Sequence, residues 1–118
     1  VCLQAVVPIS HEDNIISLKT KCFKKFRGLI TEFFNSPEQY LKNAWMQNQS
    51  EATYAPKRLP EDSQLNMDAS TMDIYNLYRS CDPVLYPAFY IKNGIKFIVR
   101  DMKITWYGKL KMNIYVDR

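Results

Sequence analysis

One long irregular stretch, residues 49–69, divides the sequence. It carries Pro56 and Pro60 among other turn-forming residues, and its apolar residues follow neither a helical nor a strand period. Irregular segments of this length in compact proteins are usually functional loops or linkers. We therefore predict an N-terminal piece (residues 1–48), a linker loop (49–69) and a C-terminal piece (70–118).

The N-terminal piece is predicted to hold a strand followed by helices. Residues 1–9 are rich in β-branched residues and reach a proline only near their end, which is typical of a buried strand. Apolar residues then recur at helical spacing and define one face of a long helix: Ile15, Leu18, Cys22, Phe26, Leu29 and Phe33. Ser36-Pro37 predicts the start of a short second helix, because serine caps a first turn and proline suits its first position.

The C-terminal piece is predicted to hold a helix and then hairpins. Ser70 and Asp73 suit a helix start, and Asp82-Pro83 suits its end. The apolar period then changes to two, and Asn93-Gly94 lies between two alternating runs, which is a strong signal for a tight hairpin. The same alternation predicts a second strand pair that turns at Gly108, over residues 103–107 and 109–116. The expected fold class is α+β.

The amino-acid composition limits the kinds of partner and binding site that this chain can have. The chain has 16 Lys and Arg against 12 Asp and Glu, so its net charge is +4, which permits a phosphate-bearing partner. One His and three scattered Cys argue against a metal cluster, and three Gly leave no glycine-rich phosphate loop. We expect the cysteines to be reduced and buried in a cytoplasmic protein. No apolar run is long enough to span a membrane, so no membrane partner is expected.

Few side chains form a convincing site. His11 stands beside Glu12 and Asp13, but adjacent residues in a turn cannot all face one substrate, so we expect a turn or cap there. Tyr54 and Arg58 lie together in the linker loop, where an aromatic ring beside cations can stack a base and hold a phosphate. No catalytic residue and no metal ligand is predicted.

Three segments, taken together, resemble the folate-dependent formyltransferase superfamily. They are Gln4–Ile9 (QAVVPI), Ser50–Leu65 (SEATYAPKRLPEDSQL), and Ile74–Cys81 (IYNLYRSC) with the following Tyr86–Phe89 (YPAF). The resemblance covers residues 4–104 in the expected order. The chain departs from it where many members carry Asp, Trp and Gly, at Asn66, Met67 and Ala88.

The resemblance implies transfer of a formyl group from 10-formyltetrahydrofolate to a primary amine. The catalytic Asn, His and Asp of the superfamily lie in a Rossmann-like domain, and none of them matches this sequence; His11 does not match the motif histidine. The chain is therefore identified as a C-terminal portion, with the edge of the Rossmann-like domain in residues 1–48. We expect it to be inactive alone.

The resemblance leaves the acceptor open between two branches. The segments Arg79–Asp82 and Tyr86–Phe89, and the short sequence after the hairpins, look more like enzymes that formylate nucleotide-linked 4-amino sugars, as in lipopolysaccharide biosynthesis. The alternative acceptor is methionyl initiator tRNA. The expected substrate-binding residues are Tyr54, Arg58 and Arg79, the last of which can instead satisfy helix carbonyls.

Two further alternatives come from the chain itself. Unpaired strand edges in the C-terminal piece predict a non-catalytic binding or dimerisation module whose hairpins pair across a two-fold axis, giving a homodimer. The basic balance also allows a general nucleic-acid binder.

Overall fold

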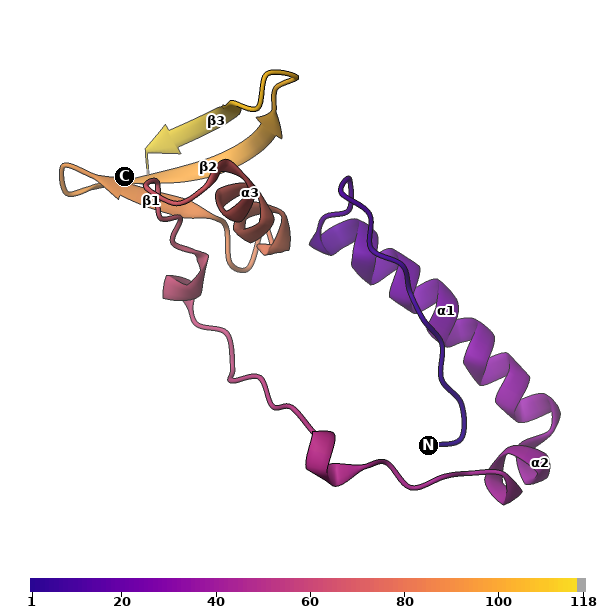
Figure 1. Cartoon of the computed structure of the whole chain (residues 1–118). Coiled ribbons are helices and arrows are strands. Elements are labelled where there is room, and N and C mark those ends of the chain that lie inside the picture. Colours follow the sequence, from indigo (N-terminus) through magenta and orange to yellow (C-terminus); the bar gives the residue numbers. More distant parts are fainter. Residues whose placement is uncertain (117–118) are drawn as a thin grey trace. The chain divides into compact units, whose positions relative to one another are not determined.

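The computed structural model describes residues 1–116, which fall into two compact units (Figure 1). The first unit is Val1–Pro56, and the second begins at Lys57. The division between them lies inside the linker loop anticipated from the sequence. The partition into residues 1–48, 49–69 and 70–118 stays a prediction.

The first unit is built on a long helix, α1 (Ile15–Asn35), followed by the short α2 (Pro37–Lys42) and a single 3₁₀ turn, η1 (Gln49–Glu51). Asn14 begins α1, because its Oδ1 accepts hydrogen bonds from the backbone N–H groups of Ile16 and Ser17 at 3.0 Å. The predicted long helix is confirmed.

The start of α2 differs from the prediction in one respect. Pro37 takes the first helical position as predicted, but the side chain of Ser36 makes no capping hydrogen bond. Ser36 also ends α1, where its N–H donates to the carbonyl of Phe33 at 3.2 Å. The end of α1 thus sets the conformation of Ser36, and the predicted cap is wrong.

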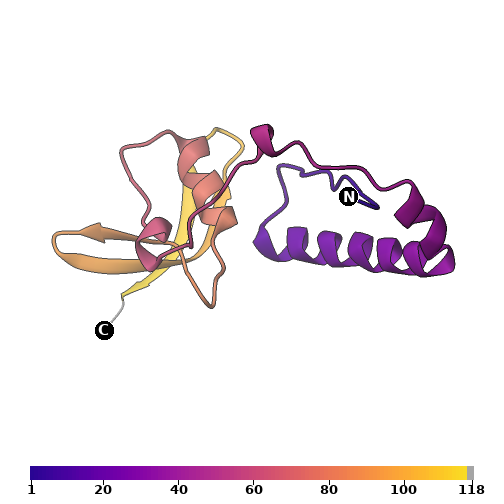
Figure 2. The same cartoon turned by 90° about the horizontal axis from the view of Figure 1, so that it is seen from below.

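Residues 1–9 form no strand within the described part of the chain. They run extended alongside α1 (Figures 1 and 2), and only Val1 is paired: its N and O exchange hydrogen bonds with the backbone of Trp45 at 2.6 and 3.1 Å. A strand exists only against a neighbouring strand, and the described residues supply none here. The prediction of a buried strand is therefore wrong for this structure, which leaves the predicted Rossmann-like edge without support.

The apolar face of α1 is only partly covered. Ile15, Leu18, Leu29 and Phe33 are half-buried, but Cys22 and Phe26 are exposed, and α1 has no buried residue among those described. The predicted burial of Cys22 is wrong, because no element of the unit packs over that side of the helix. A stripe of exposed apolar side chains follows the same helix: Phe23, Phe26, Ile30 and Phe34.

The second unit consists of a 3₁₀ turn, η2 (Pro60–Ser63), one helix, α3 (Thr71–Ser80), and an antiparallel sheet of order β1-β2-β3. The strands are Phe89–Lys92, Ile95–Ile104 and Leu110–Val116. The predicted cap is confirmed, since Ser70 Oγ accepts from the N–H of Asp73 at 3.2 Å.

The two predicted hairpins share one continuous strand, β2, and so form a three-stranded meander. Asn93 (φ 52°) and Gly94 (φ 76°) both adopt the left-handed conformation that the tight turn requires. The Asn-Gly hairpin is confirmed.

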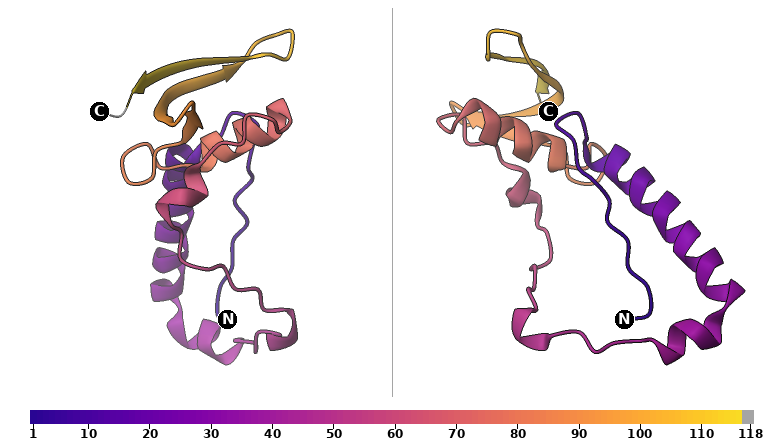
Figure 3. Two further views of the ribbon diagram at one scale, coloured as in Figure 1. Left: turned by 90° about the vertical axis from the view of Figure 1, so that its left-hand side faces the viewer. Right: turned by 45° about the vertical axis from the view of Figure 1, so that its right-hand side comes forward.

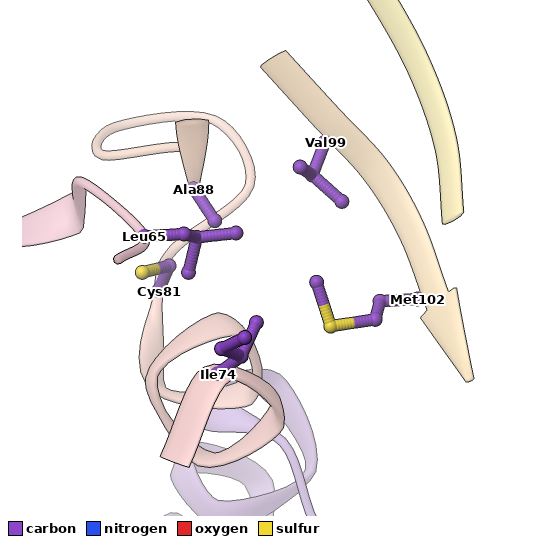
Figure 4. Packing of buried hydrophobic residues seen from close by; sticks show 6 residues of the cluster. All are labelled: Leu65, Ile74, Cys81, Ala88, Val99 and Met102. Carbon is purple, nitrogen blue, oxygen red and sulfur yellow. The ribbon is translucent and has the colours of Figure 1, made fainter. Parts of the chain in front are cut away.

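The hydrophobic core of the second unit lies between α3 and one face of the sheet (Figures 2 and 4). It contains Leu65, Ile74, Cys81, Ala88, Val99 and Met102. The end of the linker loop takes part in it, because Leu65 donates its N–H to the carbonyl of Phe89 at 2.7 Å. The predicted burial of Cys81 is confirmed.

A β-bulge at Arg100 divides β2. Val99 pairs with Ile114 and Asp101 pairs with Asn113, so Arg100 has no opposite residue. The bulge lets Val99 and Met102, three residues apart, both face α3. Tyr78 of α3 lies near the bulge, with its hydroxyl 3.4 Å from the carbonyl oxygen of Arg100, and burial raises the pKa of this phenol.

Candidate functional site

Arg58 is held inside the second unit. Its Nη2 donates to Ser63 Oγ at 3.2 Å and lies 3.2 Å from Cys81 Sγ and 3.4 Å from the carbonyl oxygen of Asp62. Ser63 is 1% exposed and donates to the carbonyl of Tyr86. These contacts tie the linker loop to the end of α3, and they occupy one side of the guanidinium.

Tyr54 and Arg79 have different surroundings from Arg58. Tyr54 belongs to the first unit and is 88% exposed, between the turns η1 and η2. Arg79 is half-buried in the last turn of α3, where its Nε donates to Asn76 Oδ1 at 2.9 Å. The structure therefore gives each of the three expected residues its own surroundings.

Asp13 gives the His11–Asp13 segment its structural role at the start of α1. Its carboxylate accepts from Lys21 Nζ at 2.6 Å, from Ser10 N–H at 2.8 Å and from Ser17 Oγ at 2.8 Å. The Lys21 ammonium, followed by the Ser10 and Ser17 donors, holds the pKa of this carboxyl well below its usual range. Asp13 thus fixes the start of α1, in keeping with the cap role expected for this segment.

A basic surface on the outer face of the sheet was missed from the sequence. Alternation along β2 and β3 directs Met102, Leu110 and Met112 toward α3, so their neighbours point to the opposite face. We call this opposite face the basic face. Its exposed cations are Lys96, Arg100, Lys103 and Lys111, with Lys109 just before β3.

Two aromatic rings lie beneath cations on the basic face. Lys96 Nζ is 4.5 Å from the ring centroid of Phe89, and the Arg100 guanidinium is 4.2 Å from that of Tyr115. Asp101 is the carboxylate of this face, with its oxygen 3.9 Å from Lys103 Nζ. The sequence signal for the basic face was the alternation of Lys with apolar residues. This alternation assigns the lysines to one face only once the strand register and the bulge are known.

The connection from β2 to β3 is a tight turn over Thr105–Lys109 (Figure 3). Gly108 (φ 80°) allows the turn, and its N–H donates to the Thr105 carbonyl at 2.8 Å. Trp106 projects from the turn and is 95% exposed. Aromatic rings and cations thus occur together at this end of the basic face.

Two other kinds of feature, a metal cluster and a membrane-spanning helix, are not found among the described residues. Residues 1–116 bring no three His, Cys, Asp or Glu side chains together in an arrangement that could hold a metal ion. No helix in that range has the length and apolarity needed to cross a bilayer.

Comparison with known proteins decides the family. No protein-family model matches the chain. The methionyl-tRNA formyltransferase of Lactococcus lactis subsp. cremoris is 28% identical over 103 residues, which cover 86% of this chain and 31% of the relative. That of Kosmotoga olearia is 32% identical over 83 residues, covering 70% of this chain and 27% of the relative.

A solved structure, methionyl-tRNA formyltransferase from Clostridium thermocellum, is similar with a TM-score of 0.52 and 26% identity. The similarity covers 72% of this chain and 39% of that one. The chain belongs to the formyltransferase superfamily. As a formyltransferase homologue, it spans about a third of the length of the relatives that it matches.

The matches bear on the expected branch of formyltransferases. These relatives are methionyl-tRNA formyltransferases, and none is a nucleotide-sugar enzyme. The nucleotide-sugar acceptor and a role in lipopolysaccharide biosynthesis are therefore unsupported, and the tRNA alternative fits better.

Proposed function

We propose that this chain is part of a methionyl-tRNA formyltransferase and supplies binding surface for the tRNA. The observation that carries the proposal is the agreement of its relatives, over up to 86% of the chain, on that one activity. The reaction would move a formyl group from a folate donor, 10-formyltetrahydrofolate, to the amino group of methionyl-tRNA. The expected cytoplasmic location is part of the same proposal.

The charge of the second unit supports this role. Within residues 1–116, the basic face carries four strand cations and Lys109 against the single carboxylate of Asp101. Cations concentrated on one face attract the phosphate backbone of RNA and raise the rate of encounter. A nucleotide sugar carries only two phosphates and would use a small part of such a surface.

We propose that the pocket for the folate donor lies mostly outside this chain. A pterin ring needs polar groups set in an enclosed cavity, and the buried polar side chains of this structure are Asp13 and Ser63. Asp13 is engaged by Ser10, Ser17 and Lys21, and Ser63 by Arg58 and Tyr86. We therefore assign no residue of this chain to the donor, and we assign none to the chemical step.

The three residues expected from the sequence enter the proposal with different roles. Tyr54 is exposed and Arg79 is half-buried at the end of α3, so both stay candidate contacts to the acceptor. Arg58 donates inside the unit, so we propose that it acts by holding the linker loop in place.

The test is a competition between acceptors. The polypeptide that carries this chain is given 10-formyltetrahydrofolate together with methionyl initiator tRNA and with dTDP- or UDP-linked 4-amino sugars. We expect formylmethionyl-tRNA as the product. Formylated sugar with unchanged methionyl-tRNA would reject the proposal.

A second candidate function is dimerisation, because β3 is an edge strand with no pairing on its outer side among the described residues. Two copies would pair through β3 across a two-fold axis. Light scattering of the chain over a range of concentrations tests this idea, and a constant monomer mass would exclude it.

A further inference from the structure

Trp106 is a large ring held almost wholly in water. It is 95% exposed, whereas Trp45, the other tryptophan of the chain, is 50% exposed. Tyr107 lies beside it, with ring centroids 5.3 Å apart and planes at 85°, and is 57% exposed. A single exposed apolar residue needs no special explanation. Trp106 differs because it lies on an ordered turn and is surrounded by cationic side chains.

The turn that carries Trp106 is fixed by its own hydrogen bonds. The N–H of Thr105 donates to the Lys109 carbonyl at 2.7 Å, and Thr105 Oγ1 donates to the same oxygen at 2.8 Å. Thr105 Oγ1 also accepts from the Lys109 N–H at 3.0 Å. A ring carried on a backbone already ordered loses little conformational entropy when a partner covers it.

The neighbouring strands carry an electrostatic cost that an anion would relieve. Lys103 and Lys111 are directly opposite in the β2–β3 register, and Lys109 follows from the turn on the same side of the ladder. Like charges directly opposite in an antiparallel pair are destabilising. Asp101 offsets this only weakly, at 3.9 Å from Lys103 and at an exposed position.

We propose that Trp106 stacks on an unpaired base of an RNA, while Lys103, Lys109 and Lys111 hold the phosphates beside that base. An aromatic ring projecting from a cationic surface matches a partner that offers π faces and phosphates together, which is a single-stranded nucleic acid. An acidic peptide would use the lysines but leave the ring without a matching face. The inference rests on the proposed function, which supplies tRNA as the RNA.

The direct test uses tryptophan fluorescence. A Trp45→Phe variant of the full chain leaves Trp106 as its one tryptophan. It is titrated with three oligonucleotides of equal phosphate number: single-stranded oligouridylate, an abasic oligomer and a blunt RNA duplex. We expect stacking to quench the emission of Trp106 with oligouridylate, whereas the abasic oligomer and the duplex bind without comparable quenching.

Variants separate stacking from charge. Trp106→Ala should weaken binding of oligouridylate by about 5- to 100-fold and leave the salt slope unchanged. Trp106→Phe should recover part of the loss. Lys103→Gln should lower the salt slope by about 1 for all three oligonucleotides. Trp45→Ala is the matched control, and thermal unfolding checks that each variant folds.

The inference is overturned if Trp106→Ala binds oligouridylate as tightly as the parent, or if the abasic oligomer quenches equally. A change of molecular mass caused by Trp106→Ala would also overturn it, since the ring would then serve contact between copies. The proposed function fails separately: a formylated sugar in the acceptor competition rejects tRNA as substrate, whatever the fluorescence shows. Formylated tRNA with an unresponsive Trp106 rejects the inference alone.

Discussion

The guanidinium of Arg58 lies against the buried thiol of Cys81, with 3.2 Å between Nη2 and Sγ. The same nitrogen donates to Ser63, which is itself buried. A residue of the linker loop is thereby joined to the end of α3 within one unit. This relationship makes Arg58 a structural residue and not only a candidate binding residue.

Replacing Arg58 should therefore destabilise the chain. Arg58→Ala leaves buried Ser63 without one donor and should lower the free energy of unfolding by about 1–3 kcal/mol. Urea titration followed by circular dichroism measures the change. Arg79→Ala, which removes an exposed hydrogen bond to Asn76, is the matched control and should cost less. Equal effects of the two substitutions would show that the Arg58 contacts add nothing.

The start of α1 should depend on pH through Asp13. Its pKa is lowered in the folded chain by Lys21, Ser10 and Ser17, so the stabilisation is complete above the ordinary carboxyl pKa. It is lost progressively as pH falls from about 4, where the unfolded chain begins to take up the proton, toward the lowered pKa of the folded carboxyl. Asp13→Asn should flatten this part of the pH profile of helix content, measured by circular dichroism.

Glu12→Gln is the control for Asp13, because Glu12 is its exposed neighbour. It should leave the loss of helix at low pH in place. If Asp13→Asn and the parent chain lose helix over the same pH range, the carboxylate cluster does not govern the start of α1.

The Asn93-Gly94 turn should tolerate no side chain at its second position. Gly94 has φ 76°, so Gly94→Ala should lower stability by about 1–2 kcal/mol. Gly28 is the matched control: it lies within α1 with nothing within 4 Å of an added Cβ, so Gly28→Ala should stabilise by up to about 1 kcal/mol. Thermal unfolding of both variants measures whether stability falls with Gly94→Ala and rises with Gly28→Ala.

Local signals in the sequence predicted much of the second unit. Asn93-Gly94 and the Ser70 cap depend on residues close together in the chain, and both are confirmed. The bulge at Arg100 carries no comparable local signal, because it follows from how Val99 and Met102 meet α3. The basic face was missed for the same reason.

Predictions failed where they required another element to pair with a strand or to cover a helix face. Residues 1–9 have strand composition, but composition does not supply a pairing strand, and among the described residues only Val1 has a backbone partner, Trp45. Cys22 lies on an apolar helix face, but nothing described covers it. For the candidate site, spacing grouped Tyr54 with Arg58, and packing then engaged only Arg58.

Protection against amide hydrogen exchange should differ between the units. No residue of α1 is buried, and Phe23 and Phe34 are 72% and 73% exposed, whereas the second unit has a core. Residues 15–35 should therefore exchange faster than residues 70–104. Mass spectrometry after deuterium labelling measures this, and equal protection would show that α1 is stabilised as strongly as the core.

Replacing one of the two opposed lysines, Lys103 and Lys111, should change the stability of the chain and its binding of RNA in opposite directions. Lys111→Glu places a carboxylate opposite Lys103 and should raise stability by about 0.2–1 kcal/mol. The same change should weaken binding of oligouridylate, because the proposed contact of Lys111 with a phosphate is removed. Lys25→Glu changes the net charge equally from an exposed position on α1, and it should do neither. Chemical unfolding and oligonucleotide titration of both variants test the pair of effects.

The additional residue at Arg100 bears on how this chain should be aligned with its relatives. Between Val99 and Met102, β2 contains one more residue than the paired stretch of β3. A relative with a regular strand at this place would differ by a single-residue gap in the middle of β2, and not by a gap in either turn. Placing that gap in the β2–β3 turn would shift Lys103, the lysine of β2 that follows the bulge, onto the wrong side of the sheet, and its position opposite Lys111 would be lost from the comparison.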